Sequence, residues 1–404
     1  MTSRPIYCDC QATTPVDPAV LEAMLPYFSG QFGNPSSPHR YGWEADAAVE
    51  TARTTLATAI NATPSEIAFV SGATEANNLA IKGVAEAYLA RGRHLIAVAT
   101  EHRAVLEPVR YLSTLGFEST ILPVRPDGIL DLDSLEAALR TDTILVSVMA
   151  ANNEIGVLQP LQAIGKLLRD RYALDAKPFF HSDAAQALGQ IPLDVEAMGL
   201  DLVSMTAHKI YGPKGIGALY VRRRSPRVRL APQLHGGGQE RERRSGTLNP
   251  PLIVGFAKAV EIALERQSRD SQRLIELRSR LWQAISSTYP EARLNGAWKP
   301  RLPSNLNVSF PNLDPSTLLQ NLRSTVALSS GSACSSESGK PSHVLTALGL
   351  SEGLARTSLR FGLHRDMTDE QMEAIVTDLK AIFAQMKPRE TRPPRINLEP
   401  SRKS

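Results

Sequence analysis

The sequence of 404 residues contains only three cysteines, Cys8, Cys10 and Cys334. A small and odd number of cysteines argues against a disulfide framework. Cys8 and Cys10 are separated by a single residue, but no second cysteine or histidine pair follows at a ligand spacing, so no metal site is expected. We interpret these two cysteines as alternating positions on an N-terminal strand.

Long hydrophobic runs are also missing. No apolar stretch approaches the roughly 20 residues that a membrane span requires, and the first residues contain no apolar core of a signal peptide. The sequence therefore predicts a protein without membrane contact and a cytoplasmic location.

The chain has little excess of positive over negative charge, since its formal net charge is only +4. The last 18 residues, 387–404, contain six Lys or Arg and two Glu, which leaves the rest of the chain close to neutral. Direct nucleic-acid binding is therefore not expected, since it would require a basic face on the folded body. The tail is rich in Pro and Arg and is predicted to be disordered.

What is present is typical of a globular α/β protein with two domains. Between about 67 and 221, short apolar runs alternate with amphipathic helical stretches, which predicts a mainly parallel, doubly wound sheet. A long helix over 250–284, either continuous or broken, is expected to lead to a smaller α+β unit. The apolar runs are 67–70, 95–99, 144–149, 178–180 and 202–205, and the smaller unit has strands at 305–310 and 326–329 and helices at 316–322 and 369–386.

The stretch 206–215, Thr-Ala-His-Lys-Ile-Tyr-Gly-Pro-Lys-Gly, connects two strand-like runs. Lys209 thus follows a strand end, where open α/β sheets carry their chemistry. An amine there can form a Schiff base with a carbonyl or with pyridoxal phosphate. Lys214 is a second candidate, and a surface lysine is the plain alternative for either.

Two further turns follow predicted strands. The first, Ser71-Gly-Ala-Thr-Glu75, opens a helix whose free N–H groups suit a phosphate, and Thr74 adds a hydroxyl. The second contains Asp183, whose carboxylate at a strand end requires a partner such as a pyridinium N–H. A plain helix cap is the alternative in both cases.

His102 and Cys334 are the remaining reactive candidates. His102 follows another predicted strand and could stack on an aromatic cofactor and move protons. Cys334 lies in a loop of small polar residues at about 327–340, which is an unusual place for a core cysteine. Its thiolate would be the reactive form.

Together these segments resemble the cysteine desulfurases of the iron–sulfur-cluster and nitrogen-fixation types. These are class V, aminotransferase-like enzymes of fold type I that use pyridoxal 5'-phosphate. The resemblance runs from Ile6 to about Met386. The matching segments stand in the family's order: 12–15, 33–35, 71–75, 100–102, 152–156, 208–215, 244–247 and 329–334.

The resemblance implies a role for each matching position. Lys209, rather than Lys214, is the Schiff-base lysine, and Cys334 is the sulfur-accepting nucleophile. His102 stacks on the cofactor ring. The other implied contacts are Asp183 and Gln186 to the ring, Ala73, Thr74, Thr206 and His208 to the phosphate, Thr247 to the phosphate in the other subunit of a homodimer, and Asn153 and Arg360 to the substrate carboxylate, with Asn153 also beside the cofactor.

The resemblance also implies a domain division and a reaction. The large, cofactor-binding domain would span 15–260, and the small domain 1–14 and 261–386. L-Cysteine would give L-alanine and a persulfide on Cys334, which sulfur-acceptor proteins collect for iron–sulfur clusters, thiolated tRNA or thiolated cofactors. A selenocysteine lyase, or a desulfurase dedicated to DNA or tRNA sulfur modification, remains an alternative.

Overall fold

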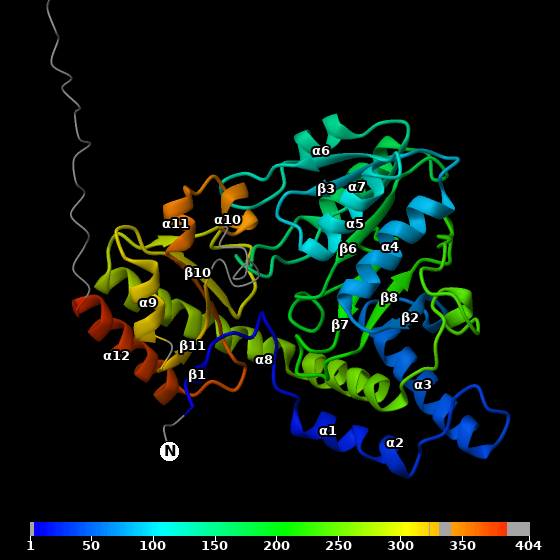
Figure 1. The fold of residues 1–404 in the computed structure, drawn as a ribbon, viewed down its shortest axis with the longest axis horizontal. Coiled ribbons are helices and arrows are strands. Elements are labelled where there is room, and N and C mark those ends of the chain that lie inside the picture. Colours follow the sequence, from blue (N-terminus) through cyan, green and yellow to red (C-terminus); the bar gives the residue numbers. More distant parts are fainter. Residues whose placement is uncertain (1–3, 323, 331–340, 386–404) are drawn as a thin grey trace, which may run out of the picture.

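The computed structural model describes residues 4–322, 324–330 and 341–385. The described chain forms two lobes that lie side by side, each built on its own sheet (Figure 1). Cys334 and the tail 387–404 lie outside the described residues. No helix within the described ranges is long and apolar enough to cross a membrane.

The larger sheet has seven strands in the spatial order β2-β8-β7-β6-β5-β3-β4. All neighbours run parallel except β8, which is antiparallel to both β2 and β7. This arrangement confirms the predicted mainly parallel sheet. The strands are β2 (Ile67–Val70), β3 (His94–Val98), β4 (Glu118–Leu122), β5 (Thr143–Ser147), β6 (Phe179–Asp183), β7 (Leu202–Thr206) and β8 (Gly217–Val221).

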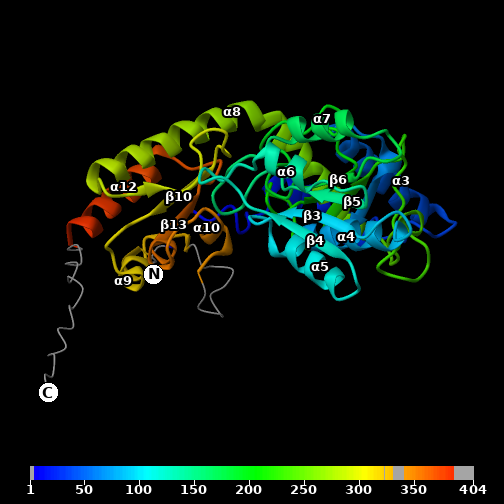
Figure 2. The ribbon, with the colours of Figure 1, turned by 90° about the horizontal axis from the view of Figure 1, so that it is seen from above.

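Helices cover both faces of this sheet, as the alternating pattern predicts (Figure 2). One face shares an apolar core with α1, α3, α6, α7 and the first half of α8. The opposite face packs on α4 and α5 in a separate core. The bounds are α1 (Pro18–Met24), α2 (Pro26–Ser29), α3 (Arg40–Ala59), α4 (Ala73–Ala87), α5 (Arg103–Ser113), α6 (Leu132–Ala138), α7 (Leu161–Arg171) and α8 (Pro250–Thr288).

The second sheet has four strands in the order β12-β13-β10-β9, with antiparallel neighbours. Next to it, β1 pairs with β11 in parallel. These strands and the surrounding helices agree with the predicted smaller α+β unit. The elements are β1 (Ile6–Tyr7), β9 (Arg293–Leu294), β10 (Asn305–Ser309), α9 (Pro315–Leu322), β11 (Val326–Ala327), β12 (Ser329–Ser330), α10 (His343–Ala347), α11 (Glu352–Arg356), β13 (Ser358–Gly362) and α12 (Asp369–Gln385).

Helix α8 joins the two lobes as one continuous element of 39 residues, so the possible break does not occur. Its first half contributes Phe256 and Val260 to the core of the larger sheet. Its second half contributes Leu277 and Leu281 to the core of the smaller one. The polar stretch between these two halves passes the junction of the lobes.

The N-terminal segment also crosses from one lobe to the other. The expected strand is present but short, since β1 ends at Tyr7. Cys8 and Cys10 are both buried and carry free thiols. Burial raises the pKa of the Cys10 thiol to about 12, so neither position offers a ready thiolate.

His181 in β6 makes the stability of the larger sheet dependent on pH. Its ring is fully buried between the hydroxyls of Ser147 and Ser204, at 2.8 and 3.0 Å. Burial lowers its pKa to about 3. Between pH 6.5 and 3 only the unfolded chain binds this proton, so stability should fall by up to about 1.4 kcal/mol per pH unit as pH decreases.

We expect His181→Gln to flatten this acid-side slope in urea unfolding measured from pH 7 to pH 4. The variant loses stability at pH 7 but should lose less on further acidification. His235→Gln, at an exposed position, is the matched control and should keep the wild-type slope. Equal slopes in all three proteins would contradict the assignment to His181.

Candidate active site

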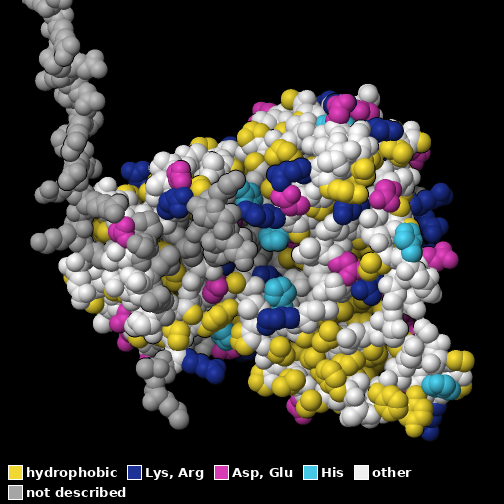
Figure 3. All heavy atoms as spheres, viewed as in Figure 1, with side chains coloured by type: hydrophobic (Ala, Val, Ile, Leu, Met, Phe, Trp, Pro, Cys, Tyr) yellow, Lys and Arg dark blue, Asp and Glu magenta, His cyan; other side chains and the backbone are white. Residues whose placement is uncertain are grey.

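A cavity of about 790 Å³ lies at the junction of the two lobes, and most of the candidate residues line it. Figure 3 shows His, Lys and Arg side chains gathered at this junction. The larger sheet contributes the carboxyl ends of its parallel strands, and β13 of the smaller sheet contributes an arginine. The lining residues include Ala73, Thr74, His102, Asn153, Asp183, Gln186, Thr206, His208, Lys209 and Arg360.

Lys209 lies in the turn that connects β7 to β8. Its Nζ donates hydrogen bonds to the carbonyl oxygens of Gln11 and Ala12, both at 2.5 Å. Lys214 lines the same cavity but is exposed. The larger-sheet turn and the N-terminal segment thus hold the Lys209 amine within the cavity wall.

Asp183 is the last residue of β6 and is only 5% exposed. The Asn77 side-chain amide donates to one carboxylate oxygen at 2.7 Å, and the Ala185 N–H donates to the other at 2.9 Å. These two donors fix the carboxylate facing the cavity. Gln186 lies beside it, with Nε2 bound to the Gln11 carbonyl at 2.9 Å and Oε1 buried without a described partner.

The N-terminus of α4 lies at the cavity, where Gly72, Ala73 and Thr74 are lining residues. α4 begins at Ala73, and its N-cap, Gly72, offers no side chain to occupy the free donors of the first turn. A side chain would not fit where this turn crosses β8, because a Cβ on Gly217 would lie 2.7 Å from the Gly72 Cα. The 15-residue helix therefore presents its positive end to the cavity.

Two histidines of the cavity are held neutral by burial. His102 caps α5, with Nδ1 accepting from the Ala104 N–H at 3.1 Å, which leaves the proton on Nε2. Burial lowers its pKa. Burial, with the charges of Lys209 and Lys214, lowers the pKa of His208 to about 4.

Arg360 extends from β13 and closes the cavity from the smaller lobe. It donates to the Asn153 carbonyl oxygen at 3.0 Å and pairs with Asp9 at 2.7 Å. Its side chain is 6% exposed. The arginine is thus held in place on two sides, beside Asn153.

One predicted residue is not part of this cavity wall, and another falls outside the described residues. Thr247 is exposed and is not among the residues that line the cavity of its own chain. Cys334 lies outside the described residues. The predicted roles of both stay predictions.

The sequence analysis missed Asn77 and Glu101. Asn77 is fully buried on α4 and orients Asp183, but no local pattern distinguishes it from other helix residues. Glu101 is fully buried beside His102, and its Oε1 accepts from the Met149 N–H at 2.6 Å. Burial raises the pKa of Glu101 well above its usual range, which favours a neutral carboxyl group.

Comparisons with known proteins agree with this arrangement. The family model described as aminotransferase class-V matches residues 6–375. A solved structure of a NifS-like protein superposes with a TM-score of 0.86, at 38% identity over 94% of this chain and 100% of that chain. The expected aminotransferase-like fold is therefore present.

Similar proteins of known activity indicate which group within this family the chain belongs to. A cysteine desulfurase of Homo sapiens is 52% identical, over 92% of this chain and 80% of the relative. The cysteine desulfurase IscS of Rickettsia typhi is 51% identical, over 92% of this chain and 89% of the relative. The chain belongs to the aminotransferase class-V family and, within it, to the cysteine desulfurases.

Proposed function

We propose that this enzyme binds pyridoxal 5'-phosphate at Lys209 and transfers the sulfur of L-cysteine to Cys334. The observation that supports this most is the meeting of Lys209, Asp183 and the α4 N-terminus at one cavity. A primary amine, a buried carboxylate and a cluster of N–H donors match the aldehyde, ring nitrogen and phosphate of this cofactor. Lys209 fits better than Lys214, because its Nζ is already fixed by two carbonyl groups.

The other lining residues also fit the cofactor. Thr74, Thr206 and His208, with the backbone of Ala73, would hold the phosphate at the helix N-terminus. The Asp183 carboxylate would pair with the protonated ring nitrogen. This ion pair would offset the unfavourable free energy of burying the carboxylate. The buried Gln186 side chain would contact the ring oxygen, and the neutral His102 ring would stack on the cofactor.

The substrate site would lie on the side of the cavity that faces the smaller lobe. Arg360, with Asn153, would bind the carboxylate of L-cysteine, since a guanidinium matches that anion in a forked geometry. The cofactor supplies an electron sink for the carbon that loses a proton. The Lys209 amine would take the proton from the α-carbon as general base.

Sulfur transfer would then require a thiolate on Cys334. That thiolate attacks the substrate's sulfur, so an S–S bond forms as the C–S bond breaks. The electron pair of the broken bond stays with the carbon skeleton, which takes up a proton and leaves as L-alanine. A thiol or an acceptor protein collects the terminal sulfur from the resulting persulfide.

We further propose a homodimer in which Thr247 reaches the partner subunit's phosphate site. Several large apolar side chains on α1–α3 are more than 40% exposed, and Figure 3 shows hydrophobic side chains gathered over α1 and α2. A contiguous apolar surface of this kind marks a contact between proteins. Its members include Leu21, Leu25, Phe28, Phe32, Tyr41 and Trp43.

Replacing part of this surface should weaken the dimer. Phe28→Asp/Phe32→Asp would place two charges into a dry contact, and we expect the dissociation constant to rise at least about tenfold. Sedimentation velocity over a dilution series measures this. Leu115→Asp, at an exposed leucine near the far sheet edge, is the control. A monomeric wild-type protein would contradict the dimer directly.

The proposed reaction is tested by its stoichiometry. The purified holoenzyme, with L-cysteine and a reducing thiol, should release L-alanine and sulfide in equal amounts. L-Selenocysteine serves as the second substrate in a parallel assay. Activity on selenocysteine without any activity on cysteine would overturn the proposed substrate and favour a selenocysteine lyase.

A further inference from the structure

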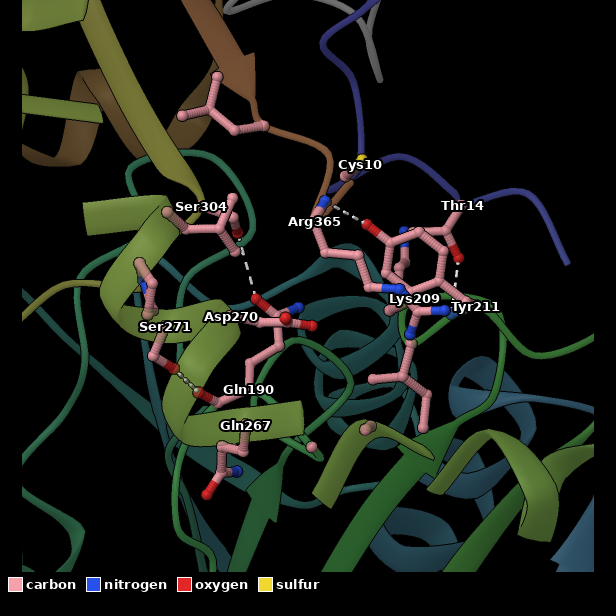
Figure 4. A pocket seen from close by; sticks show the side chains of 16 residues that line it. Cys10, Thr14, Gln190, Lys209, Tyr211, Gln267, Asp270, Ser271, Ser304 and Arg365 are labelled. Carbon is pink, nitrogen blue, oxygen red and sulfur yellow. Dashed lines mark hydrogen bonds between the residues drawn. The ribbon is translucent and has the colours of Figure 1, made fainter. Parts of the chain in front are cut away.

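A tyrosine two residues after Lys209 connects the turn of the lysine to the smaller lobe. Figure 4 shows Arg365 lying against the Tyr211 ring, with Lys209 and Thr14 nearby. These residues line a second, small cavity of about 50 Å³ behind the lysine. The proposed roles of the main cavity leave Tyr211 and Arg365 unused.

The backbone of Tyr211 is fixed in an uncommon conformation. Its φ is +65°, in the left-handed region that bulky side chains rarely adopt. The Thr14 hydroxyl accepts from the Tyr211 N–H at 2.8 Å, and the Tyr211 carbonyl accepts from the Asp17 N–H at 2.9 Å. Thr14 also binds the carbonyl oxygen of His208. Such conformations persist where surrounding contacts over-determine them, often at functional sites.

The side chain of Tyr211 reaches across to the segment that follows β13. Its hydroxyl accepts from the Arg365 N–H at 2.8 Å. The Arg365 guanidinium lies 3.8 Å from the centre of the tyrosine ring, a cation–π contact. The Arg365 side chain is 6% exposed, and its guanidinium pairs with Asp17. Tyr211 is therefore held by both the N-terminal segment and the smaller lobe.

The segment that Tyr211 contacts is continuous with the strand that carries Arg360. Arg365 is five residues beyond Arg360, and the intervening chain is held by backbone bonds between Gly362 and Cys8 and between Leu363 and Ser304. One end of this arrangement thus fixes the turn of Lys209, and the other end fixes the strand of Arg360.

We propose that Tyr211, through its contacts with Arg365, is a positioning residue that sets Lys209 relative to the carboxylate-binding Arg360. This inference rests on the proposed function, because it assumes that Lys209 moves the substrate proton. Proton transfer depends steeply on the geometry of the reacting groups. Arg360 keeps its own partners, Asn153 and Asp9, so binding of cysteine should depend less on Tyr211 than the chemical step does.

The test uses Tyr211→Phe, which removes the hydroxyl and keeps the ring. We expect kcat of the holoenzyme to fall about tenfold, with KM for L-cysteine changed by less than about twofold. The pH midpoint of the bound cofactor's absorption change should also shift, because it reports the surroundings of Lys209. Arg365→Met should act in the same direction, and the double variant should lose less than the product of the two effects.

Tyr88→Phe is the matched control. The Tyr88 hydroxyl likewise accepts from an arginine N–H, that of Arg229 at 2.9 Å, but it lies on the larger lobe away from the cavity. The Tyr88→Phe variant should leave kcat and the pH midpoint of the cofactor's absorption change at their wild-type values. A Tyr211→Phe enzyme that matches Tyr88→Phe in both readouts would overturn the proposal. So would a loss of kcat that merely follows a loss of folded protein in thermal unfolding. An inactive wild type would instead count against the proposed function.

Discussion

Lys209→Ala should abolish covalent attachment of pyridoxal 5'-phosphate and lower kcat for alanine formation by about 10³-fold or more. The variant loses both the amine that bonds the cofactor and the general base, and a positioned base alone contributes 10²–10⁴-fold. The fold should persist, because Lys209 is only partly buried and contributes little apolar surface. Visible absorption of the purified protein and single-turnover alanine formation measure the two losses.

Lys214→Ala tests which of the two lysines of the motif forms the covalent bond to the cofactor. Lys214 lines the same cavity but is exposed, so its loss should leave the covalent bond to the cofactor in place. We expect the bound cofactor's absorption to persist in this variant. A Lys209→Ala enzyme that turned over at the wild-type rate, or a Lys214→Ala enzyme that lost the covalent bond, would contradict the assignment.

Cys334→Ser should retain the cofactor and bind L-cysteine, yet release sulfide at least about 10²-fold more slowly. A thiolate forms far more readily near neutral pH than an alkoxide, so serine cannot accept sulfur from the substrate. Titration of the cofactor absorption with L-cysteine measures binding, and sulfide release to a reducing thiol measures transfer. Mass spectrometry should find the added sulfur atom on the Cys334 peptide of the wild type alone.

Cys8→Ala is the control for this prediction. Cys8 is fully buried in the core of the smaller lobe, and burial raises its pKa, so it should take no part in sulfur transfer. The sulfide released per folded enzyme should match the wild type. Wild-type sulfide release by Cys334→Ser would show that another group accepts the sulfur.

Much of the larger sheet could be predicted because buried parallel strands have a simple signature. β2, β5 and β7 lie within one or two residues of the expected apolar runs, since strands covered on both faces are apolar throughout. β4 was missed. It is an edge strand whose residues are mostly exposed, so Glu118-Ser-Thr120 gave no apolar run. β13 was missed as well, although its neighbour β10 was predicted.

The sequence pattern predicted a long helix at α8 but did not decide whether that helix is continuous. Its two halves serve different cores, so its apolar face changes along its length and resembles two helices. The division into a large domain at 15–260 and a small domain at 1–14 and 261–386 remains a prediction. The short strand β1 and the segment after it run between the lobes, and Gln11 and Ala12 end beside Lys209.

The sequence alone predicts the chemistry, because Lys209, Asp183, His102 and Cys334 stand in motifs whose residue types and order resemble those of the cysteine desulfurases. The partners that hold the described groups became visible in the folded chain. Asn77 orients Asp183, two backbone carbonyls fix Lys209, and Tyr211 connects the lysine turn to the strand of Arg360. Reactive residues can be recognised in sequence motifs because a given reaction requires particular side chains. Contacts between distant segments depend on how the sheets pack, and many sequences can satisfy them.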